Sequence, residues 1–400
     1  MTELNPHQGV NFPKGFHSAG VYCGIKKPGL LDLALIVSEQ EASVAGVFTQ
    51  NRVQAAPVRW SKQVVAGGLA RAIIANSGNA NCLTGEQGER DTQRMATLVA
   101  ERLGCAPQQV VVASTGVIGV PMPMSAIETG IPLAFTRLSN GDDRTTAEAI
   151  LTTDTFPKRV CLEVETPDGT IRLGAIAKGA GMIAPNMATM LAFITTDAAI
   201  DAHALQDCLA GVVNQTFNCI TVDGDTSTND MVIVLANGAS GVPIRERSRD
   251  AFEQGLYRIC EYLAKRIVRD GEGATKIFQV RVEGAVSEQD ARKVARTIAE
   301  SLLVKTAIHG GDPNWGRIVA AAGCSGVPIE PNQMRLILQN VIVFEHGQPL
   351  PFDELALAQK LQAEEEIQIL LTLGQGEASA AFWSSDLTAE YVKINSAYRT

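Results

Sequence analysis

Thr189 lies in a stretch of this sequence whose residue types favour covalent chemistry. Residues 178–191 read KGAGMIAPNMATML. A threonine hydroxyl is a weak nucleophile unless a base lies beside it, and a threonine at a chain N-terminus has such a base in its own α-amine. That amine, with an ordinary pKa of roughly 8, can accept a proton near neutral pH. Thr189 could therefore act as a nucleophile once the bond to the small Ala188 is cut.

The neighbouring residues would hold Thr189 at the entrance of a strand. The small residues 179–181 allow the backbone to pass close to other backbone or to a ligand, and Pro185 fixes its own φ. Residues 190–196 are apolar and β-favouring, so they predict a buried strand. A rigid strand start can keep a nucleophile in fixed geometry. The plainer interpretation is a threonine that only opens a strand.

The whole stretch resembles the self-cleavage segment of the ornithine acetyltransferase family, the bifunctional glutamate N-acetyltransferases of arginine biosynthesis. The family signature, KGxGMIxPxMATML, fits residues 178–191 without a gap. Six separated segments follow the family's order, so the resemblance covers essentially the whole chain. It implies that the Thr189 hydroxyl attacks the Ala188 carbonyl. An N-to-O acyl shift and hydrolysis would then leave an α chain of residues 1–188 and a β chain of residues 189–400.

A second segment could stabilise an oxyanion. Residues 110–113 predict a strand, and Thr115 and Gly116 follow close behind it. A hydroxyl and a backbone N–H that point in one direction are what an oxyanion hole requires. A glycine turn after a strand is commoner, but the resemblance implies that Thr115 and Gly116 form the oxyanion hole.

In the family, two further positions bind substrate. One lies in a polar patch before the central stretch, and the other is the first residue of that stretch. The polar patch TTDT begins at Thr152, and the family binds substrate with a threonine of this patch. Thr152 is preferred, with the adjacent Thr153 as the alternative. Lys178 matches the family's binding lysine and is a plausible partner for the α-carboxylate of glutamate or ornithine. Without the resemblance, Lys178 would be interpreted as an ordinary solvated lysine.

Two segments near the C-terminus complete the expected substrate site. The segment RDGEGATK carries Glu272 between glycines, after a predicted helix end, where it could meet an amino group. The resemblance implies that Glu272 binds substrate. The last residues would otherwise be dismissed as a frayed tail. In the family this tail lines the active site, so Asn395 and Thr400 are expected there.

Other motifs carry less chemistry. The loop NSGNANC at residues 76–82 suits turns with positive φ, and the resemblance places it near the site without a chemical role. The spaced aspartates after Asp223 do not match a calcium loop, which needs glycine at position 6 and glutamate at position 12. His309 with Asp312 could mimic a base and its orienting group, but no serine or cysteine nucleophile accompanies them. We expect no metal and no cofactor.

Composition limits the classes of partner. The chain has 400 residues and a formal net charge of −9, which argues against nucleic acid or an anionic membrane surface as the main partner. The eight cysteines are widely spread without a C-x-x-C pair, which favours reduced thiols. The N-terminus does not resemble a signal peptide, and no apolar stretch is long enough to span a membrane. A cytoplasmic location is expected.

Local patterns predict mixed α/β structure. Residues 159–165 and 171–177 alternate around a Pro-Asp-Gly turn and predict a hairpin. Asp91, Asp201 and Ser287 each resemble the N-cap of an amphipathic helix. The resemblance implies an αββα sandwich with helices outside two central sheets. Residues 1–188 would begin the sandwich and 189–280 complete it. Residues 281–400 would form a smaller C-terminal α/β domain with the active-site tail.

The resemblance implies a ping-pong acetyl transfer. Thr189 would take the acetyl group from N2-acetylornithine and pass it to L-glutamate, and acetyl-CoA is a further possible donor. The α and β chains would assemble as an α2β2 heterotetramer. Two alternatives remain: a self-processed aminopeptidase or amidohydrolase, which would release its acyl group to water, and a non-enzymatic binding protein, which would keep an intact chain.

Overall fold

The computed structural model describes residues 2–184 and 190–397, and these form two compact units. The first unit contains residues up to 218 together with residues 225–267, and the second contains residues 219–224 and the chain from Val268 onward. The expected boundary between residues 280 and 281 falls inside a strand, β10 (Ile277–Ala285), of the second unit. Each unit is described separately below.

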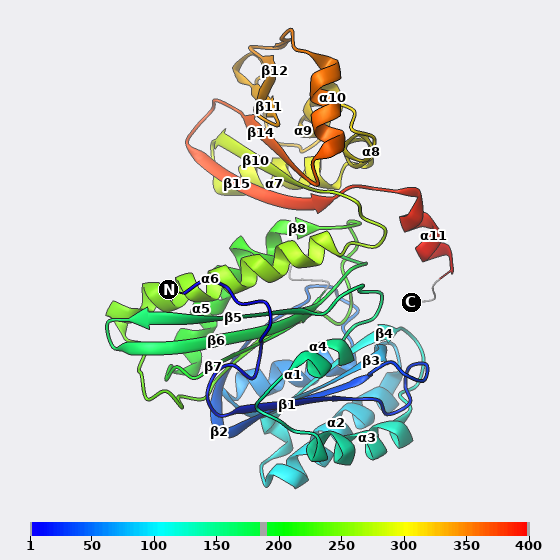
Figure 1. Ribbon diagram of the computed structural model, residues 1–400, viewed down its shortest axis with the longest axis vertical. Coiled ribbons are helices and arrows are strands. Elements are labelled where there is room, and N and C mark those ends of the chain that lie inside the picture. Colours follow the sequence, from blue (N-terminus) through cyan, green and yellow to red (C-terminus); the bar gives the residue numbers. More distant parts are fainter. Residues whose placement is uncertain (1, 185–189, 398–400) are drawn as a thin grey trace. The chain divides into compact units, whose positions relative to one another are not determined.

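The first unit is a mixed α/β structure built on one hydrogen-bonded sheet. The strand order is β4-β3-β2-β9-β7-β6-β5, and β1 also pairs with β2 (Figure 1). Its strands are β1 (Phe16–Val21), β2 (Leu33–Phe48), β3 (Leu69–Asn79), β4 (Val110–Val117), β5 (Lys158–Thr166), β6 (Gly169–Lys178), β7 (Leu191–Thr196) and β9 (Met231–Ala236). Its helices are α1 (Ala56–Ala66), α2 (Gly85–Leu103), α3 (Met124–Thr136), α4 (Arg144–Ala149), α5 (Ala202–Gln215) and most of α6 (Glu246–Arg269), with short 3-10 turns at Pro107–Gln109 and Phe217–Cys219.

This sheet is folded back on itself. In a flat sheet Asn229, just before β9, would lie three strand spacings, about 14 Å, from β4. The Asn229 Nδ2 atom instead donates a hydrogen bond of 2.8 Å to the carbonyl of Ser114 in β4. The two halves of the sheet therefore face each other, although they remain joined through the pairing of β2 with β9.

Helices cover both outer faces of this folded sheet. Apolar side chains of both halves, Ile36, Ile73, Ile176 and Phe193 among them, share one inner core. Helices α2 and α3 cover the outside of β1 to β4. Helix α6 covers β5 and β6 so closely that a Cβ on Gly255 would lie 2.6 Å from Val164 (Figure 1). The expected αββα sandwich is confirmed, and its two β layers are halves of one continuous sheet.

Local signals explain why these elements form where they do. The predicted hairpin is present, with β5 and β6 paired antiparallel. Asp201 caps α5 by accepting hydrogen bonds from the backbone N–H groups of His203 and Ala204. The N-cap assigned to Asp91 is wrong, because α2 begins six residues earlier and the Asp91 carboxylate accepts a hydrogen bond from Gln87 on the same helix. The polar first turns of α2 lack the apolar spacing that would mark its start.

The second unit contains a seven-stranded mixed sheet with helices sharing its core. The strand order is β13-β12-β11-β14-β10-β15-β8. Its strands are β8 (Ile220–Thr221), β10, β11 (Arg335–Leu338), β12 (Val341–Glu345), β13 (Gln348–Pro349), β14 (Glu366–Thr372) and β15 (Ala378–Ser385). Its helices are α7 (Glu288–Glu300), α8 (Leu302–Gly310), α9 (Trp315–Gly323), α10 (Glu354–Ala363) and α11 (Ala389–Ala397), with a 3-10 turn at Pro331–Gln333.

The cap predicted for α7 is present, since the Ser287 hydroxyl accepts a hydrogen bond from the N–H of Asp290.

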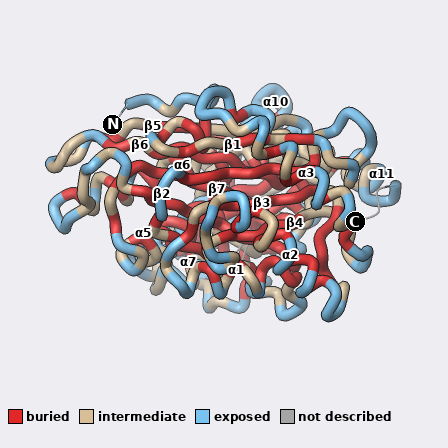
Figure 2. The backbone as a smooth tube through the Cα atoms, turned by 90° about the horizontal axis from the view of Figure 1, so that it is seen from below, coloured by how far each residue is buried: buried red, intermediate tan, exposed pale blue. Residues whose placement is uncertain are grey.

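Burial in each unit follows these layers. The strands β2, β3, β6 and β7 run through the buried centre of the first unit, whereas α11 is mostly exposed (Figure 2). Among the helices formed by the described residues, none is long and apolar enough to cross a membrane.

Candidate active site

The end of strand β4 presents the expected hydroxyl and backbone N–H. Thr115 and Gly116 are half-buried and lie near the C-terminal end of β4. There β4 runs parallel to β3, and Gly116 lies opposite Gly78. The φ of Gly116 is +130°, and a Cβ there would lie 2.4 Å from the Gly78 carbonyl carbon. Only glycine fits this position, so the backbone geometry beside Thr115 is fixed by close packing of β3 on β4.

Strand β6 brings the expected lysine to the same place. Lys178 is the last residue of β6 and is buried, with its Nζ atom 3.5 Å from Thr115 Oγ1. In a flat sheet β4 and β6 would be five strand spacings, about 24 Å, apart. The fold of the sheet therefore assembles Thr115, Gly116 and Lys178 from distant parts of the sequence.

Asp154 is a site residue that the sequence reasoning did not identify. Its fully buried carboxylate lies 2.8 Å from Lys158 Nζ and 4.0 Å from Lys178 Nζ. It also accepts a 2.6 Å hydrogen bond from the N–H of Gly179. Burial alone would raise the pKa of Asp154, but the charges of Lys158 and Lys178 outweigh it and hold this pKa below its usual range. The available signal was the aspartate of the TTDT patch with a lysine four residues on.

The TTDT threonines lie in the loop that Asp154 organises. Thr152 donates its backbone N–H to Asp154 Oδ2 at 3.1 Å, and both Thr152 and Thr153 are half-buried. This placement does not distinguish the two as substrate-binding residues. It does bring the patch to the Lys178 end of β6.

A further lysine adds positive charge to this cluster. Lys26 donates from Nζ to the backbone carbonyls of Leu31 and Leu151. Burial lowers its pKa to about 8, although the nearby carboxylates of Asp32 and Asp154 oppose the shift. With two lysines held by one aspartate and a third beside them, the region favours an anionic ligand.

Thr189, the expected nucleophile, lies outside the described residues, as do Ala188 and Thr400. The described residues on either side make defined contacts: the carbonyl of Ala184 accepts a hydrogen bond from Thr226 at 2.9 Å, and Leu191 opens β7 opposite Lys178. Thr189 therefore precedes by two residues a strand position that is paired with Lys178, the expected binding lysine.

A buried carboxyl group adjoins this strand start. Asp230 is fully buried, and its Oδ2 atom has no hydrogen-bond partner among the described residues. Burial raises the pKa of Asp230 well above its usual range, against opposing hydrogen bonds from Ser227 and the N–H of Met190. A buried carboxyl group is therefore held next to Met190, immediately before β7.

The asparagine-rich segment supports strand β4, which carries Thr115 and Gly116. Ser114 donates a 2.6 Å hydrogen bond to Asn76 Oδ1, and Asn79 Nδ2 donates to the carbonyls of Val120 and Pro121. These bonds fix the loops on both sides of Thr115. The turn expected over residues 76–82 is partly wrong, since residues 76–79 end β3, whereas Gly78 and Asn81 do have the expected positive φ.

In the second unit, the structure brings together the remaining two described site residues. Asn395 Nδ2 donates a 2.8 Å hydrogen bond to Glu272 Oε2, and Glu272 is mostly buried. Thr388 donates to the carbonyl of Gly273, whose positive φ and close approach to Tyr391 require glycine. The C-terminal segment thus holds the loop that carries Glu272.

The suggested pairing of His309 with Asp312 is wrong. His309 Nδ1 lies 2.9 Å from Asp386 Oδ2, and the hydroxyl of Thr275 donates to the same oxygen at 2.6 Å. Asp386 also accepts the backbone N–H groups of Thr275 and Lys276. This cluster anchors the Glu272 loop, and its threonine hydroxyl is already committed to the aspartate.

A hydroxyl, a backbone N–H and a cluster of buried lysines at one end of an αββα sandwich suit the transfer of an acyl group from an anionic substrate. The fold and this site define an acyltransferase. A family model described as the ArgJ family matches residues 17–400. The chain belongs to the ArgJ family.

Relatives of known sequence and structure agree. The chain is 50% identical over 397 residues to the arginine biosynthesis bifunctional protein ArgJ of Symbiobacterium thermophilum, covering 98% of each chain. It is 48% identical over 410 residues to the protein of the same name from Thermosynechococcus vestitus, again covering 98% of each. The crystal structure of arginine biosynthesis bifunctional protein ArgJ from Bacillus halodurans matches with 42% identity and a TM-score of 0.50, covering 52% of this chain and 98% of that chain.

Proposed function

We propose that this protein transfers the acetyl group of N2-acetylornithine to L-glutamate, giving ornithine and N-acetylglutamate in arginine biosynthesis. The observation that carries the proposal is the assembly of Thr115, Gly116 and Lys178 beside the strand that follows Thr189. The names of the relatives, arginine biosynthesis bifunctional protein ArgJ, support the same reaction.

The nucleophile would be made by the chain itself. The Thr189 hydroxyl attacks the carbonyl carbon of Ala188, the Ala188–Thr189 amide becomes an ester, and water hydrolyses this ester. The products are an α chain of residues 1–188 and a β chain whose N-terminal amine belongs to Thr189.

Transfer would then proceed in two half-reactions. The Thr189 α-amine takes the hydroxyl proton as Thr189 Oγ attacks the acetyl carbonyl of N2-acetylornithine. The hydroxyl of Thr115 and the N–H of Gly116 stabilise the oxyanion, and ornithine leaves with a proton on its amine. The amine of glutamate then attacks the acetyl-Thr189 ester and restores the free threonine.

The charged residues would select the substrates. Lys178, held by Asp154, binds a substrate carboxylate. Glu272, held by Asn395, binds a substrate amino group, and Thr152 or Thr153 and Thr400 complete the contacts. Acetyl-CoA can load the same threonine as an alternative donor.

The assembly would be an α2β2 heterotetramer acting in the cytoplasm. None of the eight cysteines, all of which lie among the described residues, forms a disulfide.

Intact-mass analysis under denaturing conditions tests the proposal. We expect two wild-type fragments that meet at Ala188 and Thr189, and a single chain for Thr189→Ala. Incubation with N2-acetylornithine should add one acetyl group to the β chain, and L-glutamate should remove it as N-acetylglutamate. A single wild-type chain would refute self-cleavage, and release of free acetate at the same rate with and without glutamate would indicate a hydrolase.

A further inference from the structure

The first unit contains a polar cavity far from Thr115 and Lys178. Its volume is about 360 Å³, and its lining includes Arg172, six residues before Lys178 on β6. Six residues of strand span about 20 Å. The cavity is therefore a separate place on the same sheet, and its volume lies within the range of about 300–1,000 Å³ typical of ligand sites.

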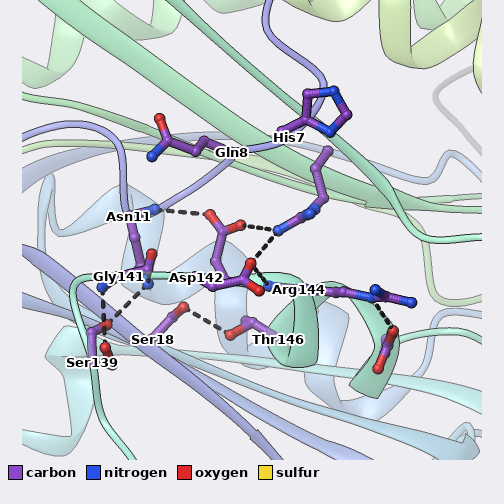
Figure 3. A network of polar contacts seen from close by, with 12 residues as sticks. His7, Gln8, Asn11, Ser18, Ser139, Gly141, Asp142, Arg144 and Thr146 are labelled. Atoms are coloured by element: carbon purple, nitrogen blue, oxygen red, sulfur yellow. Dashed lines mark hydrogen bonds and ion pairs between the residues drawn. The ribbon is translucent and has the colours of Figure 1, made fainter.

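The cavity wall formed by the N-terminal segment is fixed by buried hydrogen bonds. The backbone N–H of Asn11 donates to Asp143 Oδ2 at 3.1 Å. The Asn11 side-chain Nδ2 donates to the carbonyl of Ser139 at 2.9 Å and to that of Gly141 at 3.3 Å, as Figure 3 shows. These hydrogen bonds join protein groups to one another, so they hold this wall in place without a ligand.

A second wall is fixed in the same way. The backbone N–H of Lys14 donates to Asp197 Oδ2 at 3.3 Å, and Asn237 Nδ2 donates to the carbonyl of Lys14 at 3.0 Å. The N–H of Glu39 donates to the carbonyl of Gly15 at 2.9 Å. The side chains of Lys14 and Glu39 are thus presented from an anchored backbone.

Positive charge lines one part of this cavity. The Arg172 guanidinium lies 5.0 Å from the centre of the Phe12 ring, and its Nε is 3.0 Å from Glu163, which does not line the cavity. Stacking fixes the guanidinium plane while leaving its terminal N–H groups as donors. With Lys14, these groups can hold a carboxylate.

Acceptors occupy another part of the lining. Glu39 contributes a carboxylate that contacts His17 Nε2 through one oxygen at 2.6 Å. Asn11 lines the cavity through other atoms, because its Oδ1 is fully buried and inaccessible from the cavity.

We propose that this cavity binds a free α-amino acid. Its carboxylate lies against Arg172 and Lys14, and its ammonium group lies towards Glu39. The presence of both charges in one small cavity selects a zwitterion over a simple anion, because Glu39 repels a second negative charge. The site is independent of the acetyl transfer proposed above, and its occupant would act as an effector rather than a substrate.

Binding measured on the purified full-length protein tests this proposal. A thermal-shift panel of the twenty standard amino acids and ornithine is followed by calorimetry on those that bind, with acetate and inorganic phosphate as probes that lack an ammonium group. We expect at least one amino acid to bind, with its Kd raised at least tenfold by Lys14→Gln and by Glu39→Gln. The matched exposed substitutions Lys27→Gln and Glu165→Gln, outside the cavity, should leave the Kd unchanged.

Three results would overturn it. The first is an absence of binding by every member of the panel. The second is binding that Lys14→Gln and Glu39→Gln leave unaltered, which would place the ligand elsewhere, including the substrate site. The third is equal binding of acetate or phosphate that Glu39→Gln does not weaken, which would reduce the cavity to a general anion site. Self-cleavage and acetyl transfer by the Lys14→Gln variant should remain as in the wild type, so a failure of this proposal is distinguishable from a failure of the proposed function.

Discussion

At the scale of single residues, the site depends on buried groups whose partners are few and specific. Asp154 is fully buried between Lys158 and Lys178, and neither Asp154 nor Lys158 has any exposed side-chain surface. Asp154 also accepts a hydrogen bond from the N–H of Gly179, the second residue of the central stretch. One carboxylate therefore positions Lys178 and the backbone that leads towards Thr189.

Asp154→Asn should destabilise the first unit strongly. The substitution preserves shape but removes the buried carboxylate that faces Lys158 and Lys178, and breaking a buried ion pair by removing one partner costs about 3–5 kcal/mol. The matched control Asp142→Asn removes an aspartate that is 68% exposed and paired with Arg159, and should cost less than about 1 kcal/mol. Urea denaturation of both variants measures the difference, and equal stability of the two variants would show that Asp154 does not bear this charge.

Gly116→Ala should abolish most acetyl transfer. The new Cβ would meet the backbone of Gly78 and push the Gly116 N–H away from the oxyanion, and loss of one such donor typically costs about 10²–10³ in kcat. Gly119→Ala is the matched control, since Gly119 also has a positive φ but has open space around its Cβ position. A kcat for Gly116→Ala no lower than that of the control would remove Gly116 from the oxyanion hole.

At the scale of elements, short patterns predicted what local chemistry determines. The alternation in β5 and β6 and the cap at Asp201 required no tertiary information, and both are as predicted. The start of α2 was missed because its first turns are polar. Asp154 was missed because its loop meets Lys178 only where the β5–β6 hairpin closes, with Lys158 opposite Ala177. The sandwich was predicted from the family resemblance alone. No single stretch of sequence shows that β2 pairs with β9, so local patterns could not predict this strand order.

The C-terminal helix offers a test at this scale. Asn395→Ala removes the hydrogen bond that α11 makes to the mostly buried Glu272, and hydrogen bonds to charged groups contribute about 1.5–3 kcal/mol. We expect the KM for the substrate whose amino group Glu272 binds to rise about tenfold or more, with a smaller change in kcat. Lys393→Ala on the same helix changes an exposed residue paired with Glu390 and should leave KM as it is. If both substitutions alter KM equally, α11 acts through its general stability rather than through Asn395.

At the scale of the whole molecule, each unit has its own core and its own buried charges, so the two can differ in their response to pH. In the second unit, Lys305 is buried in α8 and donates from Nζ to Ser384 Oγ at 3.1 Å and to the carbonyl of Ser385. Burial lowers the pKa of Lys305 from 10.5 to about 8, although Asp386, Asp223 and Glu300 oppose the shift. Lys305, which holds β15 in place, therefore titrates within a pH range in which unfolding can be measured.

The sign of the resulting pH effect follows from proton uptake. Between pH 8 and 10.5 the unfolded chain keeps a proton that folded Lys305 has lost, so unfolding takes up a proton and the free energy of unfolding rises with pH. We expect the stability of the wild type relative to Lys305→Met to increase from pH 7 to pH 10. Trp315 and Trp383 both lie in the second unit, so tryptophan fluorescence during urea unfolding reports mainly on it. A constant or falling difference would mean that Lys305 stays charged in the folded protein, and the carboxylates around it would then outweigh its burial.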